Sequence, residues 1–200
     1  MHRRVMIFAG PNGSGKSTII ENAIKLGQCP DYLICADNFV PAKKKNDIDT
    51  LLNAADLAEI ARYRALLFRK SFAFETVMST HSKLDFIRHA KRHGYHVHVV
   101  YVNTGTPDIN VERVQIRVNH GGHDVPKEKI ISRYKKSLEL MFDVICEADS
   151  ADIYDNSGNS PVPIAAKLQG KFCVRDMAPR WLQKHFISKA LVQDFEIIYF

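Results

Sequence analysis

The sequence predicts an α/β fold in which a parallel sheet of about five strands is covered by helices on both faces. β-rich runs alternate with segments of helical periodicity up to residue 157, and a glycine-rich loop separates the first run from the first helix. After residue 156 the alternation gives way to the turn-rich connector NSGNSPVP. We therefore expect a main domain over residues 1–157 and a small C-terminal appendage of unknown role over residues 158–200.

The expected strands are short, and most are separated by a helical pattern. They cover residues 4–9, 32–36, 72–75, 96–102 and 151–154. Helices are expected after the glycine loop and over residues 49–69, 82–93, 108–118 and 126–148, the last opened by a proline, which is tolerated in a first turn. In the appendage we expect strands at 164–167 and 171–174 and a helix around 179–191.

The composition indicates in which cell compartment the protein works and which charge its binding partners carry. The 200 residues are 46% hydrophobic, enough for a sizeable core without disulfides, and the four cysteines show no CxxC or metal-ligand spacing. No run approaches the length of a membrane helix, so we expect a soluble cytoplasmic protein with no membrane contact. The formal net charge of +6 favours anionic partners such as nucleotides.

The glycine-rich loop carries the strongest functional signal. Residues 10–17, GPNGSGKS, match the pattern G-x-x-x-x-G-K-[ST] in the strand–loop–helix context that a phosphate-binding loop (P-loop) requires. Backbone N–H groups of such a loop surround the phosphates, Lys16 can reach the β- and γ-phosphates, and the Ser17 hydroxyl can bind Mg²⁺. We expect a site for ATP or GTP with Mg²⁺, made by Gly10, Pro11, Asn12, Gly13, Ser14, Gly15, Lys16, Ser17 and Thr18.

Polar residues at the carboxyl ends of the expected strands indicate phosphoryl transfer. Ligands of open parallel sheets bind at this edge, where Asp37 with Asn38, Glu75 with Thr76, and Asn156 are expected to lie. Asp37 could accept the proton of an attacking hydroxyl, although an Asp-Asn pair is equally good turn chemistry. No strand ends in a separate Mg²⁺-binding acid, since HVHVVYVN lacks one, so Asp37 or Glu75 would hold the waters of the ion.

Three arginines suggest a lid over residues 113–135. Arg113 and Arg117 lie four residues apart on one expected helix, Gly121 and Gly122 break it, and Arg133 follows on the next. Such arginines could contact γ-phosphate oxygens and exclude water, or they could simply be surface residues of a helical hairpin. His123, in the break, is expected to be a loop hydrogen-bonding residue or a substrate contact.

These motifs, in this order, resemble the zeta toxin family of P-loop kinases over about residues 4–157. The stretches that carry the resemblance are AGPNGSGKST, ADNF, FETVMS, RVQIRVNHGGHDVP, SRYKKSL and IYDNS. The resemblance implies an ATP- or GTP-dependent kinase, with a nucleotide sugar such as UDP-N-acetylglucosamine as acceptor and an antitoxin protein as partner.

The resemblance also implies roles for individual residues. Asp37 is similar to the family's catalytic base, and Glu75 with Thr76 to its substrate-side acidic motif. Arg117 and Arg133 are similar to its lid arginines, with Arg113 as a competitor for the first role.

Three hypotheses remain open from the sequence. The first is a small-molecule kinase that phosphorylates a hydroxyl, with Lys16, Asp37, Arg117 and Arg133 as catalytic residues and Asn38, Glu75, Thr76, His123 and Asn156 on the substrate side. The second is a polynucleotide 5′-hydroxyl kinase, suggested by the basic charge, although no aromatic platform accompanies the basic clusters. The third is a nucleotide-binding switch with little transferase activity.

Overall fold

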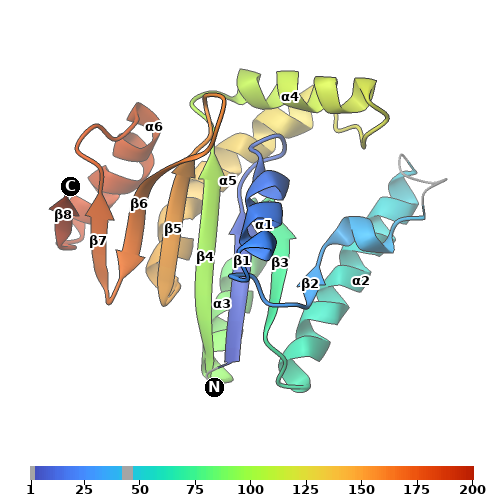
Figure 1. Ribbon diagram of the computed structural model, residues 1–200, viewed down its shortest axis with the longest axis horizontal. Helices are drawn as coiled ribbons and strands as arrows, with labels where there is room; N and C mark the ends of the chain where they lie inside the picture. The colour runs from blue at the N-terminus through green and yellow to red at the C-terminus, as the bar shows by residue number, and fades with distance from the viewer. Residues whose placement is uncertain (1–2, 42–46) are drawn as a thin grey trace.

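A single eight-stranded sheet organises the computed structural model, which describes residues 3–41 and 47–200 (Figure 1). The strand order is β2-β3-β1-β4-β5-β6-β7-β8, so β1 lies between β3 and β4. The strands are β1 (Arg3–Ala9), β2 (Leu33–Ile34), β3 (Phe72–Thr76), β4 (Tyr95–Asn103), β5 (Ser150–Asp155), β6 (Val162–Leu168), β7 (Lys171–Val174) and β8 (Ile197–Tyr199).

The predicted five parallel strands are present, but they are only part of the sheet. All four pairings among β1 to β5 are parallel. The prediction of about five strands is wrong for the whole sheet, because β6 adds to β5 in the antiparallel direction and β7 and β8 follow. The residues expected as an appendage therefore continue the central sheet, and β8 was not foreseen.

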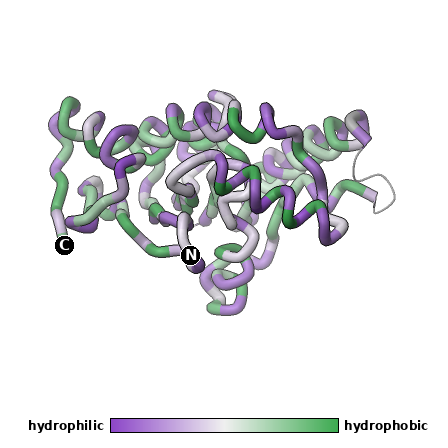
Figure 2. The backbone as a smooth tube through the Cα atoms, turned by 90° about the horizontal axis from the view of Figure 1, so that it is seen from above, coloured by the Kyte–Doolittle hydropathy of each residue, from purple (hydrophilic) through white to green (hydrophobic). Residues whose placement is uncertain are grey.

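Helices cover the two faces of the sheet unequally. On one face, α1 (Lys16–Lys25) packs its buried residues onto β1, β3 and β4. On the other face, α2 (Ile48–Leu67), α3 (Ser82–Arg92), α5 (Lys127–Glu147) and the C-terminal helices share one large apolar core. Figure 2 shows hydrophilic and hydrophobic residues alternating along the outer helices, as expected for helices that pack on a sheet.

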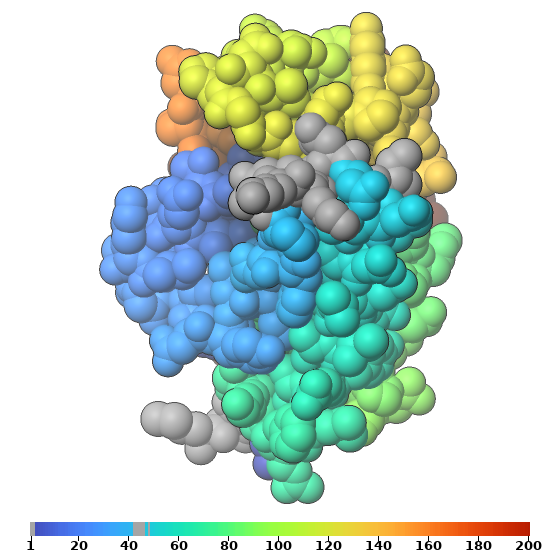
Figure 3. All heavy atoms as spheres, turned by 90° about the vertical axis from the view of Figure 1, so that its right-hand side faces the viewer, coloured from blue at the N-terminus to red at the C-terminus, as the bar shows by residue number. Residues whose placement is uncertain are grey.

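The remaining elements lie above the sheet and at its C-terminal end. The helix α4 (Pro107–Asn119) crosses the edge where the parallel strands end, and it packs on the start of α5 (Figures 1 and 3). A 3₁₀ turn, η1 (Ala36–Phe39), follows the very short β2, and the expected C-terminal helix is divided into α6 (Arg180–Leu182), η3 (Gln183–Ile187) and α7 (Ser188–Val192). Among the described residues, no helix is long and apolar enough to cross a membrane.

Candidate functional site

The glycine loop joins β1 to α1 and lies tightly against two neighbouring strand ends. Gly15 caps α1 with φ 93°, and a Cβ at this position would overlap the Asn156 side-chain amide. A Cβ at Gly10 would overlap the carbonyl oxygen of Val102 at the end of β4. Only glycine permits this approach, and the first turn of α1 carries neither an acidic residue nor a side-chain cap. The backbone N–H groups at this helix start are therefore suited to an anion.

Lys16 is held inside the loop. Its side chain is 5% exposed, and Nζ donates to the carbonyl oxygens of Gly10 at 2.9 Å and Pro11 at 3.0 Å, with Glu75 Oε1 at 3.4 Å. Burial lowers the pKa of Lys16, and the charge of Glu75 opposes this shift. The charge of Arg117 lowers the pKa further, whereas that of Asp37 raises it. The ammonium group is thus positioned between the loop carbonyls and the acidic residues.

Two carboxylates lie on the β2–β3 side of this lysine. Asp37 belongs to the exposed turn η1, and Glu75 is half-buried near the end of β3. Both also act on Cys35, whose pKa is raised to about 11 by burial, then by the charge of Glu75 and that of Asp37. The structure therefore brings together Lys16, Asp37 and Glu75, from three separate segments. Asn38, exposed, lies beside Asp37 in η1.

Thr76 stabilises the backbone after β3. Its hydroxyl accepts a hydrogen bond from the N–H of Met78, a non-glycine residue with φ 56°. Its carbonyl oxygen accepts from the N–H of Gly10 at 3.2 Å, which ties the end of β3 to the start of the glycine loop.

The three arginines make three different contacts. Arg113 donates to the carbonyl oxygens of Asn156 at 2.7 Å and Gly158 at 2.8 Å, and so fixes the segment after β5. Arg133 donates to Asn12 Oδ1 at 3.2 Å, and its burial lowers its pKa. Arg117 is exposed and donates to the carbonyl oxygen of His123 at 2.7 Å, within the segment that joins α4 to α5.

Sequence reasoning missed a set of polar residues that support the loop from the segment after β4, from α4 and from α5. Asn110 Nδ2 donates to the carbonyl oxygen of Asn12 at 2.6 Å, and the Thr104 hydroxyl donates to Asn110 Oδ1. The Tyr134 hydroxyl donates to the carbonyl oxygen of Thr104 at 2.7 Å. Applying the strand-end rule to the NTGTPDIN segment after β4 would have indicated Thr104 and Asn110.

Asn156 and Ser14 meet behind the loop. Asn156 Nδ2 donates to the carbonyl oxygen of Ser14 at 2.9 Å, which gives Asn156 a supporting position under the glycine loop. The Ser14 hydroxyl is fully buried and pairs with no protein group in the described part of the chain. Buried hydroxyls are normally hydrogen-bonded, so the Ser14 hydroxyl is an exception among the described residues.

A magnesium ion would find suitable donors here. Ser17 and Thr18 are exposed in the first turn of α1, directly after Lys16, and Glu75 supplies a carboxylate. Hydroxyl and carboxylate oxygens are the ligands that Mg²⁺ prefers, and it usually keeps several waters beside phosphates. The residues present therefore fit this ion.

The fold and this loop define a P-loop protein. The family model described as "AAA domain" matches residues 5–141, more than half of the chain, so the chain belongs to this family. An uncharacterized protein of Haemophilus influenzae is 28% identical over 138 residues, which cover 67% of this chain and 94% of that protein.

Solved structures show the same fold at low sequence identity. The AvrRxo1-ORF1:-ORF2 complex has a TM-score of 0.70 at 16% identity; the match covers 86% of this chain and 61% of that one. The PezAT toxin–antitoxin structure of Streptococcus pneumoniae has a TM-score of 0.64 at 16% identity, covering 96% and 84%. The expected α/β P-loop fold and its resemblance to a toxin–antitoxin structure are thereby confirmed. This chain spans about three fifths of the AvrRxo1 chain.

Proposed function

We propose that this protein is a Mg²⁺-dependent kinase that transfers the γ-phosphate of ATP or GTP to a hydroxyl group of a small molecule. The observation that carries this proposal is the position of Lys16, buried in the glycine loop and 3.4 Å from Glu75, with the charge of Asp37 acting on the same ammonium group. Two carboxylates beside the lysine of a phosphate-binding loop can supply the proton acceptor and the Mg²⁺-side acid that phosphoryl transfer to a hydroxyl uses.

In the proposed reaction the acceptor oxygen attacks the γ-phosphorus and forms the new P–O bond. Asp37 accepts the hydroxyl proton, and the bond from the γ-phosphorus to the β–γ bridging oxygen breaks, leaving ADP or GDP. Lys16 and Arg133 stabilise the charge on the phosphate oxygens, and Arg117 joins them from the predicted lid, residues 113–135. Ser17 would hold Mg²⁺, which would supply positive charge against the phosphate oxygens.

For the acceptor we propose a nucleotide sugar, such as UDP-N-acetylglucosamine. Asn38, Glu75, Thr76 and His123 are the proposed acceptor-side residues, whereas the hydrogen bond from Asn156 to Ser14 favours a role under the nucleotide. The AvrRxo1-ORF1:-ORF2 complex, one structure of which contains ATP, and the PezAT toxin–antitoxin structure support a nucleotide donor and an antitoxin partner for this chain as well.

The test is a phosphate-transfer assay with γ-labelled ATP, Mg²⁺ and a library of nucleotide sugars. We expect Lys16→Ala to abolish phosphate transfer. Asp37→Asn should lower the rate of transfer by about 10²–10⁴-fold, and this variant should still bind ATP. Asp31→Asn, another exposed aspartate, is the control and should keep full activity. Near-normal turnover of Asp37→Asn would refute its role as the base.

A polynucleotide 5′-hydroxyl kinase is the second candidate. The Pnkp1/Rnl/Hen1 RNA repair complex shares the fold with a TM-score of 0.52 at 16% identity, covering 81% of this chain and 48% of that one. The net charge of +6 is compatible with a nucleic acid. Labelling of 5′-hydroxyl oligonucleotides in the same assay, weakened steeply by salt, would favour this candidate over a nucleotide sugar. ATP binding with no transfer to any acceptor would instead favour a nucleotide-binding switch.

A further inference from the structure

Basic residues gather at the edge of the sheet where the parallel strands begin, which is the edge opposite the glycine loop and lies at the bottom of Figure 1. They precede or open three adjacent strands, β3, β1 and β4. We call this set the basic edge, and its members are Arg3, Arg4, Arg69, Lys70 and Arg92.

Strand pairing places these residues in one row. The N–H of Arg4 donates to Ser71 Oγ at 3.0 Å, which joins the start of β1 to the residues just before β3. On the other side of β1, Arg3 is paired in register with Tyr95 at the start of β4. Burial raises the pKa of Tyr95, and the charges of Arg3 and Arg69 both act against that shift. Since neighbouring strands lie about 4.8 Å apart, the cations follow one another along the edge.

The basic edge keeps an excess of positive charge. Four of its residues are exposed, and within the described chain none of the five forms an ion pair with a carboxylate. Arg88, earlier on α3, differs because it pairs with Glu147 Oε2 at 2.9 Å. Burial raises the pKa of Cys29, and the charges of Arg4 and Asp31 then act on it in opposite directions, so Asp31 offsets part of the row.

Two exposed aromatic rings accompany the row. Phe68, at the end of α2 and directly before Arg69, is 67% exposed. Tyr32 is 45% exposed, its carbonyl oxygen accepts from the N–H of Ala73 at 2.9 Å, and Lys70 Nζ lies 5.9 Å from the centroid of its ring. Cations that follow a nucleic-acid backbone, with aromatic rings on which bases stack, are typical of surfaces that bind single strands.

Helix ends explain only part of this arrangement. Arg69 and Arg92 lie at the C-terminal ends of α2 and α3, where the helix dipole favours a cation. That reason does not apply to Arg3 and Arg4, which open a strand, nor to the exposed ring of Phe68. Four of the five cations are arginines, whose planar guanidinium groups can donate two parallel hydrogen bonds to a phosphate.

We propose that the basic edge binds a single-stranded nucleic acid, with phosphates on the cations and bases stacked on Phe68 and Tyr32. This surface lies at the opposite edge of the sheet from the glycine loop, so it adds a binding function to the proposed kinase and does not depend on that function. Its chemistry is general for single strands, because it offers charge and stacking faces and no groups that read base edges.

The test is the fluorescence anisotropy of labelled oligothymidylate and oligouridylate of about 12 nucleotides. We expect the affinity to fall with salt, with a slope of log K against log salt of about −3.5 if all five cations contact phosphates. The double variant Arg3→Gln/Arg69→Gln should bind about tenfold more weakly at about 50 mM salt, and its slope should be shallower by about 1.4. Phe68→Ala should weaken binding by about fivefold or more with an unchanged slope, which separates stacking from charge.

The matched control is Arg180→Gln/Lys184→Gln, which removes the same charge at exposed positions of α6 and η3. It should keep both the affinity and the slope. Equal weakening in the two double variants would show attraction to the overall net charge and would overturn the proposal, as would wild-type protein that binds neither oligonucleotide at about 50 mM salt.

Two further measurements decide where the strand binds and whether a membrane is the partner instead. Binding should persist with saturating Mg²⁺–ATP and in Lys16→Ala; loss in either case would place the strand at the glycine loop and overturn the proposal. Sedimentation with phosphatidylserine vesicles that depends on Arg3 and Arg69, without oligonucleotide binding, would assign the basic edge to a membrane surface and also overturn it. None of these outcomes bears on phosphate transfer, so the proposed function is tested separately.

Discussion

At the scale of single residues, the candidate site is a cluster of charges in which each side chain alters its neighbours. Glu75 partly offsets the burial of Lys16, and it also acts on Cys35 together with Asp37. The pKa of Cys35, which lies just before η1, therefore depends on both carboxylates. The pKa of Cys35 can be measured without any substrate.

We predict that Cys35 reacts slowly with iodoacetamide at neutral pH, and that its alkylation rate rises until about pH 11. The thiolate is the reactive form, and burial with the nearby negative charges raises the pKa of Cys35 to about 11. Glu75→Gln removes one negative charge, so the pKa should fall and alkylation at pH 8 should become faster. Peptide mass spectrometry of time courses measures this rate.

The control for this prediction is Asp85→Asn, an exposed residue of α3, which should leave the rate unchanged. An equal rate in wild type and Glu75→Gln would mean that Glu75 does not act on Cys35, and the proposed cluster of carboxylates would then be wrong.

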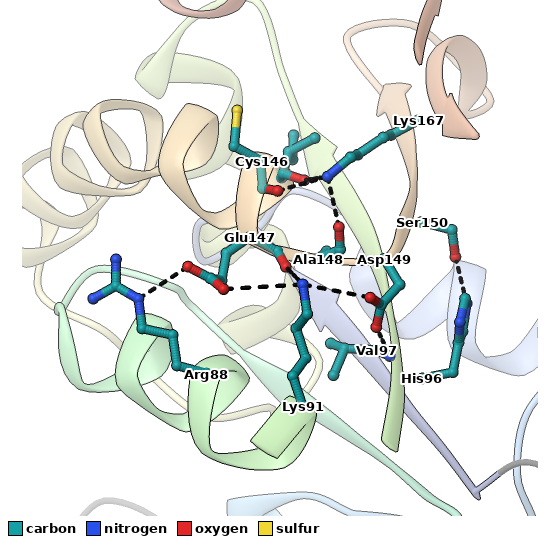
Figure 4. A network of polar contacts seen from close by, with 11 residues as sticks. Arg88, Lys91, His96, Val97, Cys146, Glu147, Ala148, Asp149, Ser150 and Lys167 are labelled. Atoms are coloured by element: carbon teal, nitrogen blue, oxygen red, sulfur yellow. Dashed lines mark hydrogen bonds and ion pairs between the residues drawn. The ribbon is translucent and has the colours of Figure 1, made fainter. Parts of the chain in front are cut away.

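At the scale of elements, the end of α5 is fixed by side chains from distant segments (Figure 4). Lys167, on β6, donates to the carbonyl oxygens of Ile145 at 3.1 Å and of Cys146 and Ala148 at 2.6 Å each. Lys91, on α3, donates to the carbonyl oxygen of Glu147. The last carbonyl groups of a helix lack partners within it, and cations are favoured there. These two lysines thus join α3, α5 and β6.

We predict that Lys167→Met lowers the free energy of unfolding by about 2–4 kcal/mol, because it leaves buried carbonyl groups without donors. Lys171→Met, on the neighbouring strand, is the matched control: its lysine pairs with Glu196 at an exposed site, and the change should stay within about 0.5 kcal/mol. Denaturant unfolding followed by circular dichroism measures both. Equal stability of the two variants would show that the helix end does not depend on Lys167.

At the scale of the whole molecule, the C-terminal residues belong to the same core as the residues before them. Phe172, Trp181 and Phe186 are buried in the cluster that also contains α3 and α5, and Phe186 packs against Phe142 with ring centroids 5.6 Å apart. The antiparallel pairing of β6 with β5 extends one continuous sheet. Residues 158–200 therefore cover apolar surface of the preceding part.

We predict that a chain ending at residue 157 does not unfold cooperatively, because it would expose β5 and the apolar face of α5 to water. Differential scanning calorimetry and size-exclusion chromatography of the fragment measure this. The full-length chain with Met177→Ala, a change at an exposed site, should melt like wild type. A sharp, reversible transition in the fragment would instead show that residues 1–157 form an independent domain.

The sequence by itself determined the parallel α/β core and the glycine loop. Both depend on local patterns: the alternation of apolar runs with helical segments, and the pattern G-x-x-x-x-G-K-[ST], whose glycines let the backbone turn and whose Lys16 and Ser17 can reach phosphate and Mg²⁺. Only the tertiary structure decided that β6 joins the sheet, that Arg113 holds the segment after β5, and that Lys167 ends a helix some 20 residues earlier. Those contacts join residues far apart in the chain, where hydrogen-bond partners are selected by proximity in the folded state and leave no periodic signal in the sequence.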